Sequence, residues 1–218
     1  MAPNMKRPSR SELLKKTYQC RIDDALACDN PLLRLSSSEL AEYESTSGQS
    51  FRIKFVRSHD ASDDVLGWIL NLTKVNMMHH YRDSEWGWNE SQKEKEMKNE
   101  KALFLIIEET KSQEKAGFVH FRFDWDEDGA LGVIYCYELQ IVDKYRCQGI
   151  GRYMVRVLKE LAVQFKFPKL MLTCLKNNPR AIKFYREKCN FIIDPSSPSK
   201  FNENKCYEIL SCKVTLER

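Results

Sequence analysis

Several features that would assign the chain to a familiar class of protein are missing from its sequence. No apolar run approaches the roughly 20 residues needed to cross a bilayer. The start, Met-Ala-Pro-Asn-Met-Lys-Arg, has no apolar segment of the kind found in export signals. The eight cysteines form no Cys-x-x-Cys pair, which argues against a zinc site. We therefore expect no membrane partner, no metal, and reduced thiols in a protein of the cytoplasm and nucleus.

A strong charge of either sign is also missing. The chain has 35 Lys and Arg against 31 Asp and Glu, a net charge of +4 at pH 7. Residues 1–21 hold six basic side chains and the single acid Glu12, so the remainder is close to neutral. A basic surface for nucleic acid is therefore not expected. The cluster Lys6-Arg7-Pro8-Ser9-Arg10 fits either a solvated tail or a short nuclear address.

The chain does contain enough apolar material for a packed core, since 42% of its residues are hydrophobic. Apolar periodicity predicts helices from Ser11, from Ser62, over 149–165 and over 178–189. Strands are predicted at 50–57, 102–109, 115–125, 131–143, 169–175, 190–194 and 205–216. This order predicts a mixed sheet with helices on both faces. We expect a flexible basic tail at 1–10, a helical extension packed on the domain at 11–48, and the domain itself at 49–218.

The strongest chemical signal is the segment Arg146-Cys147-Gln148-Gly149-Ile150-Gly151, between a predicted strand and a long helix. Glycines let the backbone approach a ligand, and the first N–H groups of a helix favour an anion. The dinucleotide fingerprint fails because Met154 stands where a third glycine belongs. The Walker motif fails because no Gly-Lys-Ser/Thr is present. Taken alone, a two-glycine turn also fits a plain connection.

Together with the downstream segment LTCLKNNPRAIKFYREKCNF, this loop resembles the two acetyl-CoA segments of the GNAT acetyltransferases. The second segment has Asn178 at a helix start, followed by Ala181 and the pair Phe184-Tyr185. The family's Gly-Phe ending is Asn190-Phe191 here, one residue later than typical. The resemblance implies acetyl-CoA as the cofactor. It also implies a GNAT fold of the α/β (α+β) class, with a mixed, mostly antiparallel seven-stranded sheet.

By the same resemblance, the pantetheine arm of the cofactor lies along a splayed strand, where a backbone N–H polarises the thioester carbonyl. The residues that would hold the cofactor are Leu139, Gln140, Ile141, Arg146, Cys147, Gln148, Gly149, Ile150, Gly151, Arg152, Thr173 and Asn178. Tyr185 is the family's usual acid for the departing CoA thiolate. A core aromatic beside Phe184 is the alternative interpretation of Tyr185.

Transfer of an acetyl group to an amine needs a base, and Glu138 is the best candidate. A glutamate within an apolar strand is costly unless it is paired or functional, so a base and a structural hydrogen bond are the two interpretations. Strict alternation puts Glu138 on one face of the strand and both Tyr135 and Tyr137 on the other, unless a β-bulge rotates them together. The predicted catalytic group is Glu138, Tyr135 and Tyr185.

The acceptor is indicated by a closer resemblance. The segments LTKVNMMHHYRDSEWGWNE, HFRFDWD and YCYELQ resemble the NatD family of histone-selective N-terminal acetyltransferases, over about residues 65–212. That resemblance implies acetylation of the free amino-terminal Ser of histone tails that begin Ser-Gly-Arg-Gly (histone four and histone two-A). Glu138 would act as the base through water. The residues that would contact the peptide are Tyr81, Trp86, Asp124, Asp126, Tyr137 and Tyr207.

The acidic stretch Asp124–Asp128 also fits a solvated hairpin turn, although an acidic rim suits a cationic acceptor. In Ser-Glu-Trp-Gly-Trp-Asn-Glu we expect Trp86 on the substrate wall and Trp88 packed inward, with Gly87 turning the chain between them. Two other functions stay open, a lysine or polyamine acetyltransferase of the same fold and a non-catalytic reader of histone tails. The expected partner is the histone tail, and the expected state is a monomer.

The four histidines receive structural interpretations. His79 and His80 fit the surface of a helix end, and His120 fits a strand residue whose ring nitrogens are satisfied by hydrogen bonds.

Overall fold

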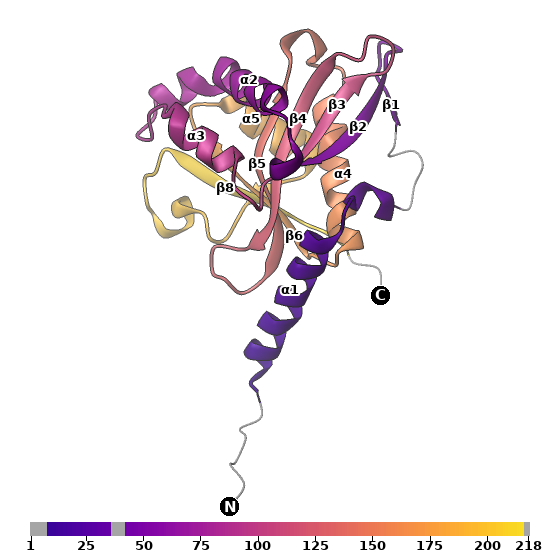
Figure 1. The fold of residues 1–218 in the computed structure, drawn as a ribbon. Coiled ribbons are helices and arrows are strands. Elements are labelled where there is room, and N and C mark those ends of the chain that lie inside the picture. The colour runs from indigo at the N-terminus through magenta and orange to yellow at the C-terminus, as the bar shows by residue number, and fades with distance from the viewer. Residues whose placement is uncertain (1–7, 36–41, 216–218) are drawn as a thin grey trace, which may run out of the picture.

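An eight-stranded sheet forms the centre of the computed structural model, which describes residues 8–35 and 42–215 (Figure 1). The strand order is β1-β2-β3-β4-β5-β6-β8-β7, and among these neighbours only β5 and β6 run parallel. The strands are β1 (Glu42–Glu44), β2 (Ser50–Arg57), β3 (Leu103–Glu109), β4 (Lys115–Trp125), β5 (Gly132–Ile141), β6 (Lys169–Leu175), β7 (Ile192–Ile193) and β8 (Tyr207–Lys213). The predicted mixed, mostly antiparallel sheet is confirmed.

The sheet has one strand more than predicted. β1 lies inside the stretch that was expected to be a helical extension, and it pairs with the start of β2 across a turn at Gly48. The segment Glu-Tyr-Glu is too short to show an alternating pattern, which is why its periodicity gave no strand signal. The N-terminal extension is therefore tied into the sheet edge by backbone pairing.

The main helices are α1 (Arg10–Ala27), α2 (Asp63–Arg82), α3 (Glu90–Met97), α4 (Ile150–Gln164) and α5 (Pro179–Lys183). Side-chain caps start four of them, because an oxygen of Ser9, Ser62, Asn89 or Asn178 accepts an N–H of the first turn. A π-helical segment, Phe184–Lys188, follows α5 directly. None of the described helices is both long and apolar enough to span a membrane.

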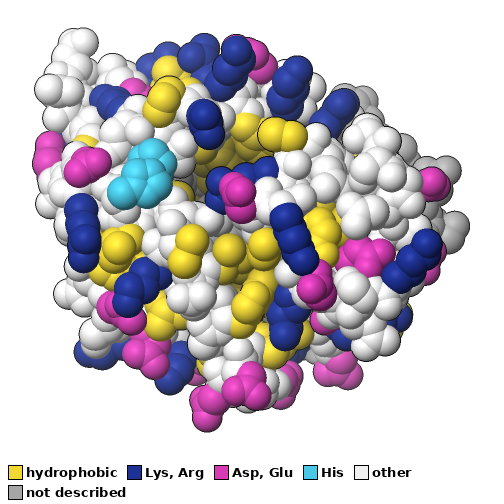
Figure 2. Space-filling model, turned by 90° about the horizontal axis from the view of Figure 1, so that it is seen from above, with side chains coloured by type: hydrophobic (Ala, Val, Ile, Leu, Met, Phe, Trp, Pro, Cys, Tyr) yellow, Lys and Arg dark blue, Asp and Glu magenta, His cyan; other side chains and the backbone are white. Residues whose placement is uncertain are grey.

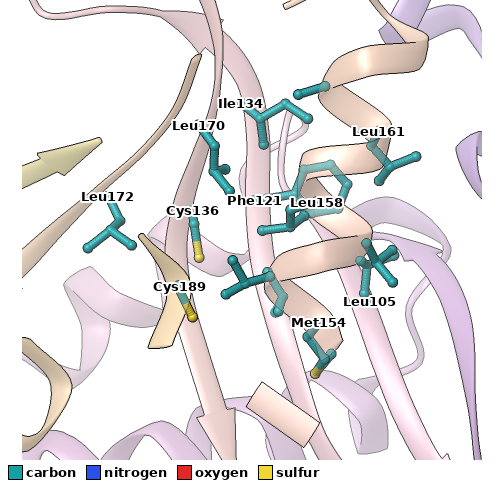
Figure 3. Close-up of a cluster of buried hydrophobic side chains, with 14 of the residues drawn as sticks. Leu105, Phe121, Ile134, Cys136, Met154, Leu158, Leu161, Leu170, Leu172 and Cys189 are labelled. Carbon is teal, nitrogen blue, oxygen red and sulfur yellow. The ribbon is translucent and has the colours of Figure 1, made fainter. Parts of the chain in front are cut away.

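The larger part of the core lies between α4 and one face of the sheet (Figure 3). Met154, Leu158 and Leu161 of α4 point toward side chains of β3 to β6. The facing side chains that Figure 3 labels are Leu105, Phe121, Ile134, Cys136, Leu170 and Leu172. Each fully buried apolar side chain of this size contributes about 1.5–3 kcal/mol, so this layer makes the sheet a rigid base for the site.

The opposite face of the sheet is covered by α2 and α3 over a smaller cluster that includes Ile69, Phe104 and Phe118. Met97 is the only buried residue of α3, whose sequence Glu-Ser-Gln-Lys-Glu-Lys-Glu-Met is otherwise polar. The helix is therefore anchored at its C-terminal end. Its remaining inward-facing side chains lie over β5, where they help to build the site.

The C-terminal half of α1 packs on the α4 side of the sheet through Tyr18, Ile22 and Ala25. Its N-terminal half projects from the body of the molecule (Figure 1), and Leu13 and Leu14 are exposed there.

Candidate active site

The parallel strands β5 and β6 separate in the middle of the sheet. Their register pairs only Ile134, Tyr135 and Cys136 with the start of β6, although β5 continues to Ile141 and β6 to Leu175. Beyond Cys136 the ladder to β6 ends, so backbone groups of β5 on that side have no β6 partner. An extended ligand arm can pair with such an edge in the manner of an added strand.

A β-bulge lies in β5 at this same point. Glu138 pairs with His120 on β4 and Cys136 pairs with the next β4 residue, Phe121, so Tyr137 is the extra residue. One extra residue reverses the alternation of a strand. Tyr137 stacks on His120 with ring centroids 4.9 Å apart, and Glu138 faces α3 on that side. The bulge thus brings Tyr135, Tyr137 and Glu138 to one face, which is the second of the two arrangements considered from the sequence.

The glycine loop before α4 has the conformation expected of an anion cradle. Cys147 and Gly149 have φ of +59° and +84°, and Gly149 caps α4 with no side-chain hydrogen bond to its first turn. Arg146 is held over the end of β5, because its Nε donates to the Ile141 carbonyl (3.3 Å) and its Nη2 to Asn76 Oδ1 (2.5 Å). The first N–H groups of α4 are therefore left to a ligand.

The β1–β2 hairpin braces this loop from the side. The Tyr43 hydroxyl donates to the Gln148 carbonyl (2.8 Å), and its ring stacks on Tyr153 of α4 at 4.6 Å. A Cβ atom at Gly149 would lie 2.1 Å from the Tyr43 hydroxyl oxygen. Glycine is therefore required at this position for two reasons, the left-handed backbone and the close approach of Tyr43. The sequence patterns did not identify Tyr43.

Glu138 is buried, with 5% of its side chain exposed, and it is paired. Lys93 on α3 donates to its Oε1 (3.0 Å), and the Gln140 Nε2 donates to its Oε2 (2.8 Å). Gln140 is in turn held by Asn76 of α2, whose Nδ2 donates to the Gln140 Oε1 (3.0 Å). Both interpretations of Glu138 apply to its geometry, since the carboxylate has structural partners and also lies at the strand split.

The aromatic side chains expected to form a wall do lie together. The Trp86 ring lies 6.1 Å from the Tyr81 ring and 5.0 Å from the Tyr207 ring of β8. Trp88 meets Tyr81 edge to face at 5.6 Å, and Gly87 between the tryptophans has a φ of +63°. A cavity of about 350 Å³ is lined by Tyr81, Trp86, Gly87, Trp88, Asn89, Gln92, Lys93 and Glu96. Trp88 thus lines the cavity as well as packing inward.

The chain from residue 74 to residue 191, more than half of its length, matches the family described as Acetyltransferase (GNAT) family. The protein belongs to the GNAT family. The chemistry of this family is acyl transfer from acetyl-CoA. Among the described residues, no group of three His, Cys, Asp or Glu side chains could hold a metal ion.

Solved structures support the fold assignment. A GNAT-family acetyltransferase from Listeria monocytogenes 4b F2365 is 12% identical, with a TM-score of 0.56 over 79% of this chain and 99% of that one. Tetrahymena GCN5 is also 12% identical, with a TM-score of 0.57 over 76% and 98% of the two chains. A spermidine N-acetyltransferase from Vibrio cholerae, solved with CoA and spermine, is 16% identical, with a TM-score of 0.51 over 74% and 95%. At these identities the likeness is one of fold.

The residues of this GNAT domain fit acetyl-CoA. Gly149 precedes α4 with no side chain over the first turn of the helix, and the edge of β5 beyond the bulge can pair with a pantetheine arm. Asn178 caps α5 through the Ala181 N–H (3.1 Å). The face that carries α2 and α5, seen from above in Figure 2, is hollowed over hydrophobic side chains, with Lys and Arg around the rim. A basic rim suits the phosphates of such a cofactor.

Two tyrosines of the predicted catalytic group are partly or wholly withdrawn from solvent, since Tyr185 is buried and Tyr135 is half-buried. Burial raises the pKa of Tyr185 well above its usual value, and nearby thiols such as Cys136 and Cys174 act in the same direction. Burial also raises the pKa of Tyr135, whose hydroxyl oxygen lies 2.6 Å from that of Thr173. Both phenols therefore stay protonated near neutral pH and can donate a hydrogen bond or a proton. Tyr185 lies in the π-helical segment after α5, a feature frequent at functional sites.

The two aspartates assigned to the substrate have different surroundings. Asp126 is buried in the β4–β5 turn, where its Oδ1 accepts the N–H groups of Ala130 (2.8 Å) and Leu131 (3.0 Å). The turn interpretation therefore accounts for this carboxylate oxygen. Asp124 is half-buried at the end of β4. Burial raises the pKa of Tyr137, the charge of Arg122 opposes this rise, and the charge of Asp124 adds to it. Asp124 thus lies near the predicted groove.

His120 lies in β4 as predicted, but the expectation that hydrogen bonds satisfy its ring nitrogens was wrong. Its ring is fully buried, and neither nitrogen has a hydrogen-bond partner among the described residues. Burial, with the charges of Arg122 and Lys93, keeps the pKa of His120 well below 6.5, so the ring is neutral. It packs between the rings of Phe104 and Tyr137 and fills the space behind the site. His79 and His80 lie at the end of α2 as predicted.

Besides Tyr43 on the cofactor side, sequence reasoning missed Lys93 and Glu96 on the acceptor side. Both come from α3, whose charged sequence is typical of a solvated helix. A signal was available, because Met97 is the only apolar residue there and Lys93 lies four positions before it. Residues four apart share a helix face, so Met97 marks Lys93 as inward-facing.

Proposed function

We propose that the protein is an N-terminal acetyltransferase that moves the acetyl group of acetyl-CoA to the free amine of Ser in histone tails beginning Ser-Gly-Arg-Gly. One observation carries the proposal. Glu138 shares a face with Tyr135 and Tyr137 where β5 parts from β6, beside a mouth walled by aromatic rings. A base, an acyl-donor edge and a narrow entrance for a chain end thus meet at one place.

The chain's own groups would carry out direct transfer in a ternary complex. Acetyl-CoA, when bound, supplies the acetyl group as a thioester. The α-ammonium of the peptide loses a proton to Glu138, through a water molecule, which leaves a lone pair for attack. A backbone N–H of β5 beyond the bulge stabilises the developing oxyanion. Tyr185, which its raised pKa keeps protonated, donates a proton to the departing sulfur.

The walls of the mouth support selection of a chain end followed by a cationic residue. Trp86, Tyr81 and Tyr207 enclose the entrance. Asp124 beside Tyr137 offers a carboxylate for an arginine side chain. The resemblance to the NatD family over about residues 65–212 supports the same acceptor. We further propose a monomer of the cytoplasm and nucleus whose partner is the histone tail, with no direct role for nucleic acid or membrane.

The decisive experiment compares two synthetic peptides that begin Ser-Gly-Arg-Gly and differ only in a blocked amino terminus. Mass spectrometry after incubation with acetyl-CoA should find one added acetyl group on the free-amine peptide and none on the blocked one. Transfer to lysine side chains of the blocked peptide would instead identify a lysine acetyltransferase. Acetylation of spermidine alone would identify a polyamine enzyme.

The experiment also distinguishes a non-catalytic reader of histone tails. In that case the free-amine peptide would bind tightly, as measured by calorimetry, and would keep its mass. Glu138→Gln is the matched control, since it preserves the size of the side chain and removes the proposed base.

A further inference from the structure

The ammonium group of Lys93 is enclosed beside the proposed base. Only 11% of its side chain is exposed. Its Nζ lies 3.0 Å from Glu138 Oε1, 3.0 Å from Glu96 Oε1 and 3.1 Å from the Tyr81 hydroxyl. A lysine ammonium has three protons to donate, and each of them has an acceptor in this arrangement. All three ammonium protons of Lys93 are thus used in hydrogen bonds within the site.

The charge of Lys93 is maintained by its neighbours. Burial alone would lower its pKa, but the charge of Glu138, with Tyr81 and Glu96, outweighs burial and raises it. An ammonium with a raised pKa has no lone pair at neutral pH, so Lys93 is not a nucleophile that competes for the acetyl group.

Glu138 needs such a partner. A buried carboxylate is expensive to ionise unless a positive charge or several hydrogen-bond donors face it. Apart from Lys93, the donor that the described residues supply to its side-chain oxygens is Gln140, which is neutral. Lys93 is therefore the cationic partner that faces the Glu138 carboxylate inside the site.

We propose that Lys93 is a positioning residue for acetyl transfer, which places a positive charge beside the Glu138 carboxylate and holds it in one orientation, ready to receive a proton. The inference rests on the proposed role of Glu138 as the base. In the proton-transfer step an N–H bond of the peptide ammonium breaks and an O–H bond forms on Glu138, while Lys93 keeps its three protons. Glu96 also accepts a hydrogen bond from the Lys93 ammonium and thereby weakens the electrostatic attraction between Lys93 and Glu138.

The test is a titration of Glu138 itself, by carbon NMR of protein labelled at its glutamate carboxyl carbons. The Glu138 signal is assigned by its absence in Glu138→Gln. Lys93→Met removes the positive charge and should move the Glu138 midpoint upward by about 1–3 pH units. Glu96→Gln removes a negative neighbour and should move it downward. Lys95→Met, the same change at an exposed position of α3, should leave the midpoint where it is.

Opposite shifts in the first two variants are the expected result, because the Lys93 charge acts directly on Glu138 and the Glu96 charge opposes it. In activity assays the acid limb of the rate profile should move to higher pH in Lys93→Met by the same amount as the NMR midpoint. A Glu138 midpoint that stays unchanged in both variants overturns the inference. If Lys93→Met does not fold, the downward shift in Glu96→Gln decides alone.

The titration requires no acceptor, so it separates this inference from the proposed function. A wild-type protein that leaves the free-amine peptide unmodified contradicts the proposed function, while the NMR shifts still report on Lys93. Normal acetylation with no shift contradicts only the role of Lys93.

Discussion

The two ends of β5 contribute different kinds of group to the site, backbone groups at one end and side chains at the other. Beyond the bulge, the cofactor side uses backbone groups, the left-handed Gly149 and the first turn of α4. At the bulge, the acceptor side uses side chains, with Glu138 held by Lys93 and with aromatic rings around the entrance. A backbone site tolerates many side chains but few changes of conformation. A side-chain site depends on the chemistry of each member, so substitutions on the two sides should affect different kinetic constants.

The largest effect is expected from Glu138→Gln on the acceptor side. Loss of a general base lowers turnover by about 10²–10⁴-fold. The KM for acetyl-CoA should change little, because the cofactor loop is separate from the carboxylate. Steady-state kinetics with the free-amine peptide measure both constants. Equal turnover in the variant and the wild type would remove Glu138 from the mechanism.

Gly149→Ala should weaken the binding of acetyl-CoA on the cofactor side. A left-handed backbone costs a non-glycine residue about 1–2 kcal/mol, and the new Cβ would also collide with the Tyr43 hydroxyl. We expect the KM for acetyl-CoA to rise by about tenfold or more, since 1.4 kcal/mol is tenfold in affinity.

Gly48→Ala is the matched control, because Gly48 has a similar φ of +78° with open space around it. Adding Tyr43→Phe to Gly149→Ala removes the colliding oxygen and should restore part of the affinity. A double variant no better than Gly149→Ala would show that backbone strain alone is responsible.

Trp86→Ala should weaken peptide binding on the acceptor side. Loss of a contacting aromatic ring costs about 1 kcal/mol beyond the area it buries, which is about fivefold in the KM for the peptide. Trp88→Ala should chiefly lower the melting temperature, because Trp88 is less exposed and packs on Tyr81. If Trp88→Ala abolished peptide binding while Trp86→Ala left it unchanged, the two tryptophans would have exchanged roles.

The smallest effect is expected from Tyr43→Phe alone. It removes one hydrogen bond to the Gln148 carbonyl and keeps the ring stack on Tyr153. A single hydrogen bond contributes about 0.5–1.5 kcal/mol, so the KM for acetyl-CoA should rise only a few-fold while the KM for the peptide stays constant. A change in the peptide constant instead would link the hairpin to the acceptor side.

The contrast between the two sides also explains what the sequence could predict. Every strand except β1, and the glycine loop, follow local rules, such as alternation in β4 and the glycine spacing before α4, so they could be predicted from short segments. The aromatic wall was predicted by resemblance, and the structure does bring Trp86 and Tyr207 together.

The rest depended on contacts between segments far apart in the chain. Lys93 reaches Glu138 across 45 positions, and Tyr43 reaches Gln148 across 105. Neither the segment Glu-Tyr-Glu nor the charged sequence of α3 indicates which distant residues its side chains contact. His120 was misjudged for the same reason, because the strand pattern gives its face but not the aromatic rings that replace hydrogen bonds around it.

Because of the bulge at Tyr137, the number of residues in β5 decides which side chains face the site. Up to Tyr137 the odd-numbered residues face α3, and from Glu138 onward the even-numbered residues do. Deleting Cys136 or Tyr137 would remove the bulge and restore simple alternation, so Tyr135 and Glu138 would keep their common face while the Tyr137 ring would be lost from it. The presence of this ring beside the carboxylate is thus encoded by a count of residues. A gap placed here in an alignment with other chains would therefore signal a change of function rather than a harmless difference in strand length.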